Sequence, residues 1–573
     1  MNDTRLADVM VPMRDGVRLA TEVWIPDGAP APALLLRLPY GKDMTPEVTM
    51  APRRQALVDA GYVVVWQDVR GRFRSEGEGF EPFVAEAADG EDTIAWLVEQ
   101  PWCDGRIGMY GPSYMGCVQW QAATTGAPGL LALAPHFAST DVFKAPWFSA
   151  GGAMSWHLVH SWSMLQSAVE GMAGFTEGGL EQVMARVALN DAYLDELPMS
   201  ERPVITDTGA AAWWPKWMAH TDHDGYWRAI AAAPAAASVT TPALHVVGWF
   251  DLYADESVAS YRLMRELAAT EEARAGQRLV IGPWDHASQS GVYPHRDFGT
   301  SASAAACGIE DLHLRFFDQH LRGDAEALAD DAPVRIFVMG ADTWRDEEAW
   351  PLPDTDYREF HLAGPDDASR ATGGTLSPDP SSSDAADAFL SDPGNPVPSA
   401  GGRMLVVGDP LGCGPVDQSA VEERPDVLCF TTPALESDLE VTGHVSLVLY
   451  VTSTALDTDV TGKLVDVHPD GRALYLTDGI LRMRYRHSLE RPEPMVPGEV
   501  HEVRIDLGVT SNVFREGHRL RLEISSSNYP RYDRNTNTGG HIATETAFQI
   551  AHNAVLHGPS APSRLILPII DRG

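Results

Sequence analysis

Lysine is scarce in this sequence, and negative charge is in excess. Only four of the 573 residues are lysine, and 43 Lys and Arg residues stand against 80 Asp and Glu residues, for a formal net charge of −37. Such a surface repels the phosphates of nucleic acids, so no nucleic-acid partner is expected. The 44% hydrophobic content is nevertheless that of a globular chain. At roughly 150 residues per domain, the length predicts about three or four cores.

Paired cysteines, long apolar runs and an apolar amino-terminal segment are also missing. The five cysteines form no C-x-x-C pair and are odd in number, which indicates reduced thiols rather than disulfides or a zinc cluster. The longest uncharged stretch, residues 229–250, is interrupted by Pro234 and Pro242. Charged side chains are spread through the first eighteen residues, where a secretory signal needs an apolar run. We therefore expect a cytoplasmic protein with no membrane partner.

Strand and helix patterns alternate in the first part of the chain. Short apolar runs at residues 33–38, 62–67 and 106–110 are typical of buried parallel strands, and residues 85–100 have helical spacing. This alternation predicts a doubly wound α/β sheet over residues 1–140.

A Trp-rich stretch of helical periodicity follows, over residues 141–238, and strand patterns resume in residues 239–352. We expect a helical cap inserted into the α/β domain, although an independent helical domain would show the same pattern. From residue 353 to 573 the strands alternate at period two, with hairpin signals at Asp470-Gly471 and Asp478-Gly479. The last part should be an antiparallel β-sandwich of jelly-roll type.

One motif has the context of a nucleophile elbow. Residues 111–116 read Gly-Pro-Ser-Tyr-Met-Gly, which has one residue more after the serine than the G-x-S-x-G of a nucleophile elbow; the segment follows a predicted strand and precedes a predicted helix. The flanking glycines allow a tight turn that exposes the Ser113 hydroxyl at the helix amino terminus, where negative charge is stabilised. An ordinary glycine-rich turn is the alternative.

A serine nucleophile needs a histidine base and an orienting carboxylate, here in the order Ser, acid, His. Asp251 and His286 each follow a predicted strand, at the sheet edge where α/β sheets build their sites. Asp255 and Asp285 are rival acids. We favour Asp251 because Asp285 adjoins His286 in the chain and Asp255 lies a helical turn beyond the strand.

The oxyanion of an acyl-transfer intermediate needs two donors. The backbone N–H of Tyr114, directly after the nucleophile, supplies one. Tyr40 follows the first strand and offers a phenol as the second, although a tyrosine in that place is more often a packing residue.

Long sequence strings add to these motifs, namely residues 10–18, 67–71 and 525–535 together with the three catalytic segments. In them the chain resembles the serine hydrolase family of cocaine esterases, α-amino-acid ester hydrolases and X-Pro dipeptidyl peptidases. The resemblance spans nearly the whole chain. It implies an α/β-hydrolase domain with an inserted helical cap and a carboxyl-terminal jelly roll. It also implies Ser113 as nucleophile, His286 as base, Asp251 as its orienter, and Tyr40 with the Tyr114 amide as oxyanion hole.

The resemblance also implies an acyl pocket, formed by Trp147, Trp162, Tyr253, Leu405 and Val406. Tyr253 stands where the family pattern has Phe, and Val406 where it has an aromatic residue, which predicts a wider and slightly more polar pocket. The acidic residues expected to bind a substrate ammonium in amino-ester hydrolases are missing directly after Asp251. Asp255 remains as a partial substitute.

Two histidine pairs are candidate metal ligands, His157 with His160 and His220 with His223. No third ligand is identifiable for either, so we expect packed or solvated histidines, no metal and no cofactor. The segment 68–72, Asp-Val-Arg-Gly-Arg, is expected to stabilise loops of the site rather than bind an anion.

The sequence thus predicts a serine carboxylesterase that hydrolyses small-molecule esters with an aryl or branched apolar acyl group through an acyl-enzyme. The alternatives are an amide or peptide hydrolase, or acyltransferase, with the same residues, and a carbohydrate-binding scaffold without activity. The sequence is compatible with a homodimer.

Overall fold

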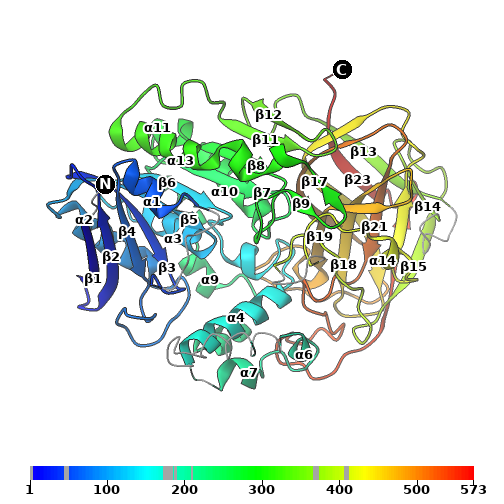
Figure 1. Ribbon diagram of the computed structural model, residues 1–573. Coiled ribbons are helices and arrows are strands. Elements are labelled where there is room, and N and C mark those ends of the chain that lie inside the picture. The colour runs from blue at the N-terminus through cyan, green and yellow to red at the C-terminus, as the bar shows by residue number, and fades with distance from the viewer. Residues whose placement is uncertain are drawn as a thin grey trace.

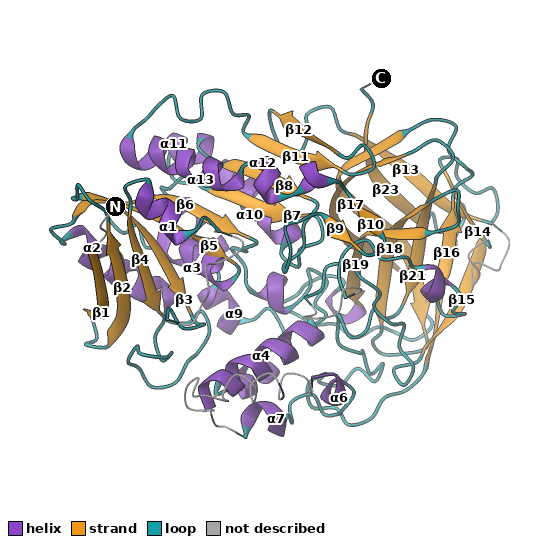
Figure 2. Cartoon of the chain, in the orientation of Figure 1, coloured by secondary structure: helices purple, strands orange, loops and turns teal. Residues whose placement is uncertain are grey.

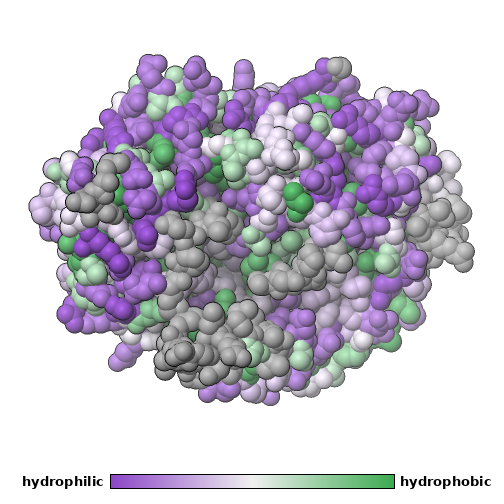
Figure 3. Space-filling model, viewed as in Figure 1, coloured by the Kyte–Doolittle hydropathy of each residue, from purple (hydrophilic) through white to green (hydrophobic). Residues whose placement is uncertain are grey.

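The computed structural model describes residues 4–43, 51–171, 185, 190–207, 209, 211–364, 373–405 and 412–572. In Figure 1 the amino-terminal α/β part and the carboxyl-terminal β-rich part lie on opposite sides, with helices of residues 156–206 below them. The face in Figure 3 is mostly hydrophilic, as the charge of −37 leads one to expect.

The α/β part is built on a ten-stranded sheet. In spatial order its strands are β1 (Thr4–Pro12), β2 (Arg18–Ile25), β4 (Val63–Asp68), β3 (Ala31–Leu38), β5 (Cys103–Pro112), β6 (Leu130–His136), β7 (Leu244–Gly248), β8 (Arg278–Gly282), β11 (Val334–Val338) and β12 (Thr343–Glu347). From β4 to β11 in this order, neighbouring strands are parallel. The pairs β1–β2, β2–β4 and β11–β12 are antiparallel. The apolar runs predicted as parallel strands are β3, β4 and β5, so the expectation of an α/β sheet is confirmed.

Helices connect these strands, as parallel pairing requires. They are α1 (Arg54–Asp59), α2 (Glu86–Val98), α3 (Tyr114–Ala123), α10 (Ala254–Leu267), α11 (Glu271–Ala275), η3 (Thr300–Ala302), α12 (Ala304–Cys307), α13 (Ile309–Phe317) and η4 (Asp318–Arg322). A small hairpin of β9 (Val292–Tyr293) and β10 (Arg296–Asp297) follows β8.

The helical insertion leaves the sheet after β6 and returns at β7, which is the next strand in the sheet. Its described elements are η1 (Phe143–Trp147), α4 (Trp156–Gly171), α6 (Asn190–Leu194), α7 (Pro203–Thr206), α8 (Trp213–Ala219), α9 (Gly225–Ile230) and η2 (Ala233–Ser238). One hydrophobic core runs without a break from the sheet, through Leu36 and Tyr110, to Trp213 and Trp217 of the insertion. The insertion is therefore packed onto the sheet rather than standing apart from it.

The carboxyl-terminal part is an eleven-stranded sheet, drawn as orange arrows on the right of Figure 2. It consists of β13 (Asp356–Ala363), β14 (Gly374–Ser377), β15 (Ala385–Ser391), β16 (Leu428–Thr431), β17 (Leu439–Ser453), β18 (Asp459–Val467), β19 (Ala473–Arg482), β20 (His501–Phe514), β21 (Arg519–Ser525), β22 (Ala551–His557) and β23 (Arg564–Ile570), with the short helices α14 (Ser419–Glu422) and η5 (Met483–Tyr485). Its strand pairs are antiparallel as expected, except that β14 and β16 are parallel.

One of the two predicted hairpins is confirmed and the other is wrong. Asp470 and Gly471 lie in the turn between β18 and β19, where Gly471 has φ of +95°. Asp478 and Gly479 instead lie in the middle of β19. Glycine is needed there because the Asp506 carbonyl oxygen on β20 lies 1.7 Å from where a Cβ of residue 479 would stand.

Main-chain hydrogen bonds tie the insertion to the carboxyl-terminal part. The His157 amide donates to the Pro530 carbonyl over 2.9 Å, and the Asp533 amide donates to the Met154 carbonyl over 3.0 Å. The Arg482 amide of β19 donates to the Gly151 carbonyl over 2.9 Å. The string 525–535 that carries the family resemblance thus contributes residues that hold the insertion in place. Among the helices that the structure describes, none is long and apolar enough to cross a membrane.

Candidate active site

Ser113 occupies a strained turn between β5 and α3. Its backbone has φ of +60° and ψ of −127°, outside the regions that a residue with a side chain prefers, at a cost of about 1–3 kcal/mol. The turn is held on both sides: the Ser113 amide donates to the His136 carbonyl over 2.9 Å, and the Ser113 carbonyl accepts from Gly116 and Cys117. Strain that is fixed in this way is typical of a nucleophile elbow.

Both glycines of the motif are required by close packing. A Cβ at Gly111 would lie 2.9 Å from the Cβ of Met115, and a Cβ at Gly116 would lie 2.6 Å from that of Ala138. Residue 116 also faces the His136 carbonyl oxygen at 3.0 Å. The motif is therefore a packed strand–turn–helix junction and not a loose glycine-rich turn.

His286 and Asp251 meet Ser113 at the carboxyl ends of neighbouring strands. Asp251 follows β7 and His286 follows β8. The Nδ1 atom of His286 lies 2.7 Å from Oδ2 of Asp251, and its Nε2 atom lies 3.1 Å from the Ser113 hydroxyl oxygen. With the proton on Nδ1 donated to Asp251, Nε2 is left free to accept the Ser113 proton.

Asp251 is also fixed by its own loop. It is fully buried, and its Oδ1 atom accepts a hydrogen bond of 2.7 Å from the Tyr253 amide. Its Oδ2 atom is thereby free to accept a hydrogen bond from His286, which is 8% exposed. A buried carboxylate with both oxygens bonded can orient the imidazole and stabilise its protonated form.

The two rival acids have other partners. Asp285 accepts from the amides of Ala287 at 2.7 Å and Ser288 at 2.9 Å, so its side chain turns back on its own loop. Asp255 accepts from the Val509 amide at 2.8 Å and from Arg403 at 2.6 Å. Asp255 is thus paired with Arg403, and its role as a partial substitute in binding a substrate ammonium stays a prediction.

Tyr40 brings its hydroxyl to the nucleophile. It follows β3, and the indole N–H of Trp162 donates to its oxygen over 3.4 Å. Burial raises the pKa of Tyr40 to about 12, although its hydrogen bonds with Trp162 and Ser113 act to lower it. The phenol therefore stays protonated and can donate.

Tyr114 contributes its main chain, because its side chain points elsewhere. Its hydroxyl donates to Glu86 over 2.8 Å, and its ring stacks on Phe83 at a centroid distance of 4.3 Å. Its amide is the first of helix α3, where amides have no acceptor within the helix. This amide and the Tyr40 phenol are the two donors that the sequence singled out.

Three of the five predicted pocket residues lie in the aromatic surroundings of this site. Trp147 of η1 and Trp162 of α4 have ring centroids 5.1 Å apart, and the ring of Tyr253 lies 5.6 Å from His286. Burial raises the pKa of Tyr253 well above its usual range, so it too stays neutral.

Leu405 lines a cavity of about 230 Å³ with Leu158 of the insertion and Leu252, the neighbour of Asp251. Val406 lies outside the described residues.

Sequence reasoning missed Phe137 and Trp217. Phe137 follows β6, has φ of +45°, and lies 5.8 Å from the His286 ring. Its position at a strand end was a usable signal. Trp217 of α8 lies 4.5 Å from Trp147 and stacks on Trp162 at 5.9 Å. Nothing local distinguishes it from its tryptophan neighbours.

The histidine pairs are packed, as expected. His160 and His157 both bond to Asn190, at 2.8 Å and 3.3 Å, and burial lowers the pKa of His160 to about 4. His220 and His223 each contact a different carboxylate, Asp224 at 2.6 Å and Asp141 at 3.3 Å.

Comparison with known proteins identifies the family of this chain. The family model of the X-Pro dipeptidyl-peptidase (S15 family) matches residues 15–288, and that of the X-Pro dipeptidyl-peptidase C-terminal non-catalytic domain matches residues 326–566. Cocaine esterase from Rhodococcus sp. (strain MB1 Bresler) is 45% identical over 99% of this chain and 98% of its own.

Two solved structures share the fold over their whole length. An aminopeptidase from a marine sediment archaeon, Thaumarchaeota archaeon, is 25% identical with a TM-score of 0.82, covering 100% of this chain and 97% of its own. An α-amino acid ester hydrolase is 26% identical with a TM-score of 0.79, covering 99% and 97%.

The fold and the matched families define an α/β-hydrolase with a carboxyl-terminal β-rich, non-catalytic domain. The chain belongs to the serine hydrolase family of cocaine esterases, α-amino-acid ester hydrolases and X-Pro dipeptidyl peptidases. It is a serine hydrolase that acts on ester bonds. The inactive carbohydrate-binding scaffold finds no support.

Proposed function

We propose that this chain is a carboxylesterase in which Ser113, His286 and Asp251 form a catalytic triad. The observation that carries the proposal is the continuous contact from Asp251 through His286 to Ser113, with distances of 2.7 and 3.1 Å. His286 removes the Ser113 proton as the hydroxyl attacks the ester carbonyl, and then donates it to the leaving alcohol. Water, activated by the same imidazole, releases the acyl group from Ser113.

The tetrahedral intermediates are stabilised by the Tyr40 phenol and the Tyr114 amide. Both are donors, and neither has to move from a distant position, since Tyr40 is bonded to Trp162 and Tyr114 begins a packed helix. Preorganised donors of this kind supply a large share of esterase catalysis.

The acyl group is aryl or branched and apolar in this proposal. Support comes from Tyr253, whose ring lies 5.6 Å from that of His286, from Trp162, which donates to Tyr40, and from Trp147, which packs on Trp162. The family resemblance gives the same role to Leu405 and Val406. Peptides are less favoured as substrates because Asp255, the candidate anchor for an amino terminus, is already paired with Arg403.

We also propose the domain division 1–140, 141–238, 239–352 and 353–573, with the last part a jelly roll. The division at 352 is supported by β11 and β12, which extend the α/β sheet and end at Glu347. In this proposal the protein acts in the cytoplasm on small-molecule esters, as a monomer or as a homodimer.

Covalent labelling tests the mechanism. A fluorophosphonate followed by peptide mapping should modify Ser113 in the wild type and not in a folded Ser113→Ala variant. That variant should lose roughly 10⁶-fold in turnover. Near-normal esterase activity in folded Ser113→Ala protein would refute the triad.

A panel of p-nitrophenyl esters of increasing acyl size tests the pocket separately. We expect kcat/KM to be highest for benzoyl or branched acyl groups, and Trp162→Ala to reduce it more for benzoyl than for acetyl esters. Trp96→Ala is the control, since Trp96 packs on Trp102 in another core. A preference for short chains that Trp162→Ala leaves unchanged would keep the triad and overturn the aromatic pocket.

A further inference from the structure

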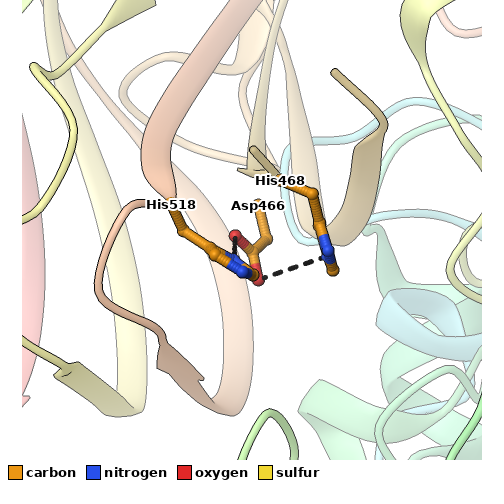
Figure 4. Close-up of side chains that lie close together, drawn as sticks. All are labelled: Asp466, His468 and His518. Atoms are coloured by element: carbon orange, nitrogen blue, oxygen red, sulfur yellow. Dashed lines mark hydrogen bonds and ion pairs between the residues drawn. The ribbon is translucent and has the colours of Figure 1, made fainter. Parts of the chain in front are cut away.

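Three metal-ligating side chains meet at the ends of two neighbouring strands of the carboxyl-terminal sheet. Asp466 is the second-last residue of β18, His468 begins the turn after it, and His518 directly precedes β21. Their ligand atoms all lie within 4.8 Å of one another. Figure 4 shows the carboxylate of Asp466 between the two imidazole rings.

The distances suit a single ion. His518 Nδ1 lies 2.8 Å from Asp466 Oδ1, and His468 Nε2 lies 3.8 Å from Asp466 Oδ2. Zinc bonds to nitrogen and oxygen are about 2.0–2.2 Å long, so tetrahedral ligand atoms stand about 3.3 Å apart. The two separations, each to a different oxygen of the Asp466 carboxylate, lie on either side of that value. The proposed geometry therefore needs the side chains to turn so that one carboxylate oxygen and both nitrogens face the ion.

The backbone presents these residues in fixed positions. β18 and β21 are paired, with Asp466 opposite Leu520. The His468 amide donates to the Arg472 carbonyl over 2.8 Å, and its carbonyl accepts from Gly471 over 3.0 Å, so the turn that holds His468 is closed. The site thus needs no folding step of its own.

A cavity leaves one side of the cluster open. Its volume is about 170 Å³, and it is lined by the three residues together with apolar side chains from both halves of the chain, including Phe298, Met339 and Val513. A water molecule in this cavity can fill the fourth position of an ion held by three protein ligands.

Nearby cations do not oppose an ion here. Arg296 and Arg515 also line the cavity. Arg296 is paired with Asp342 at 2.6 Å, and Arg515 with Asp438 at 2.6 Å. Arg472, beside the turn, is paired with Asp470 at 2.9 Å. Asp466 therefore remains as the negative charge that faces both histidines.

We propose that Asp466, His468 and His518 bind a Zn²⁺ ion, with water from the cavity as the fourth ligand. Two imidazoles and a carboxylate are ligands that zinc prefers. The ion replaces the proton shared by His518 and Asp466, and it fastens the ends of β18 and β21 beside the interface with the α/β part. The site shares no residue with the proposed triad, so it is independent of the esterase mechanism.

Zinc binding by the full chain tests this proposal. Untagged protein is stripped with a chelator and titrated with Zn²⁺ against a chromogenic chelator. We expect one tight equivalent in the wild type. His468→Ala and His518→Ala should weaken it by more than the roughly 10–100-fold that loss of an outer-shell partner costs.

His220→Ala is the matched control, because His220 also pairs with a carboxylate, at 2.6 Å, but has no third ligand within the described residues. It should keep the full affinity. Zn²⁺ should raise the thermal midpoint of the wild type and of His220→Ala, but not of His468→Ala. Co²⁺ should give a visible absorption band of four-coordinate type that the two ligand variants lack.

Asp466→Asn covers the case in which a histidine variant fails to fold, since it keeps the shape and one oxygen while removing the charge. This variant should bind Zn²⁺ more weakly, with little change in the thermal midpoint of the stripped protein. The proposal is overturned if the wild type binds Zn²⁺ no more tightly than His468→Ala, or if His220→Ala weakens it as much. Esterase turnover should not change on zinc removal.

Discussion

Arg403 and Asp255 are joined by a hydrogen bond of 2.6 Å between the carboxyl-terminal part and helix α10. The guanidinium of Arg403 also donates to the Trp249 carbonyl at 3.0 Å and the Val509 carbonyl at 2.6 Å. Trp249 and Asp255 lie on either side of Asp251 in the chain. A single buried side chain from a distant segment therefore clamps the loop that presents the triad acid.

Loss of this clamp should be measurable in both stability and turnover. Arg403→Lys keeps the charge but cannot serve three acceptors in one plane, which leaves a buried carbonyl without a donor. We expect the free energy of unfolding to fall by about 1–3 kcal/mol and kcat to fall with it. Guanidinium unfolding and ester hydrolysis measure the two. Arg358→Lys, at an exposed pair with Asp356, is the control and should change neither.

Removal of the Tyr40 hydroxyl should affect the reaction and not the fold. Tyr40→Phe deletes one oxyanion donor, and we expect kcat to fall by roughly 10²–10³ with little change in KM. Tyr62→Phe is the comparison, since Tyr62 precedes β4, at the opposite strand end from Tyr40, and its hydroxyl donates to Asp318 over 2.6 Å. If both variants keep wild-type kcat, Tyr40 is a packing residue, as its position alone suggested.

The choice of Asp251 over Asp285 can be tested with two matched amides. Asp251→Asn should lower kcat by about 10⁴, because an amide stabilises the wrong imidazole tautomer. Asp285→Asn keeps an oxygen for the amides of Ala287 and Ser288, so kcat should stay within a few-fold. Steady-state kinetics on one ester suffice, and equal losses in both variants would contradict the assignment.

Asp68 should make stability depend on pH. It is 1% exposed, its Oδ1 accepts from the Lys42 amide at 2.7 Å, and its Oδ2 has no hydrogen-bond partner among the described residues. Burial raises its pKa to about 6, against the opposing effect of Lys42. The folded state therefore binds the Asp68 proton more tightly than the unfolded state. The stabilisation that this proton gives the folded state is full below about pH 4 and is lost as pH rises through about 6.

Asp68→Asn removes this contribution while keeping an acceptor for Lys42. The free energies of unfolding of wild type and variant are measured at about pH 5 and about pH 8. Relative to the wild type, the variant should be more stable at the higher pH than at the lower pH. The same difference at both values would mean that Asp68 is ionised throughout.

Local patterns were enough to predict the parts of the site that lie at strand ends. The apolar runs before Tyr40, Ser113, Asp251 and His286 matched β3, β5, β7 and β8, because a buried parallel strand must be apolar on both faces. Parallel strands end at one edge, so these side chains had to converge.

Contacts between distant segments were not predictable in the same way. Asp478-Gly479 has the composition of a turn, but its glycine is required because a carbonyl on β20 lies too close for a side chain. Its aspartate pairs with Arg531. The pairing of Asp255 with Arg403 likewise joins distant segments, and nothing near Asp255 in the sequence signals it. Such features depend on packing between parts of the chain, which no local pattern records.

The bonds from residues 530 and 533 to the insertion limit how this protein can be altered. A variant cut before the carboxyl-terminal sheet would lose the main-chain partners of Met154 and His157, next to the helix that carries Trp162. No smaller working esterase is expected from such a cut. Redesign of acyl preference would have to vary the insertion and the 525–535 string as one linked set.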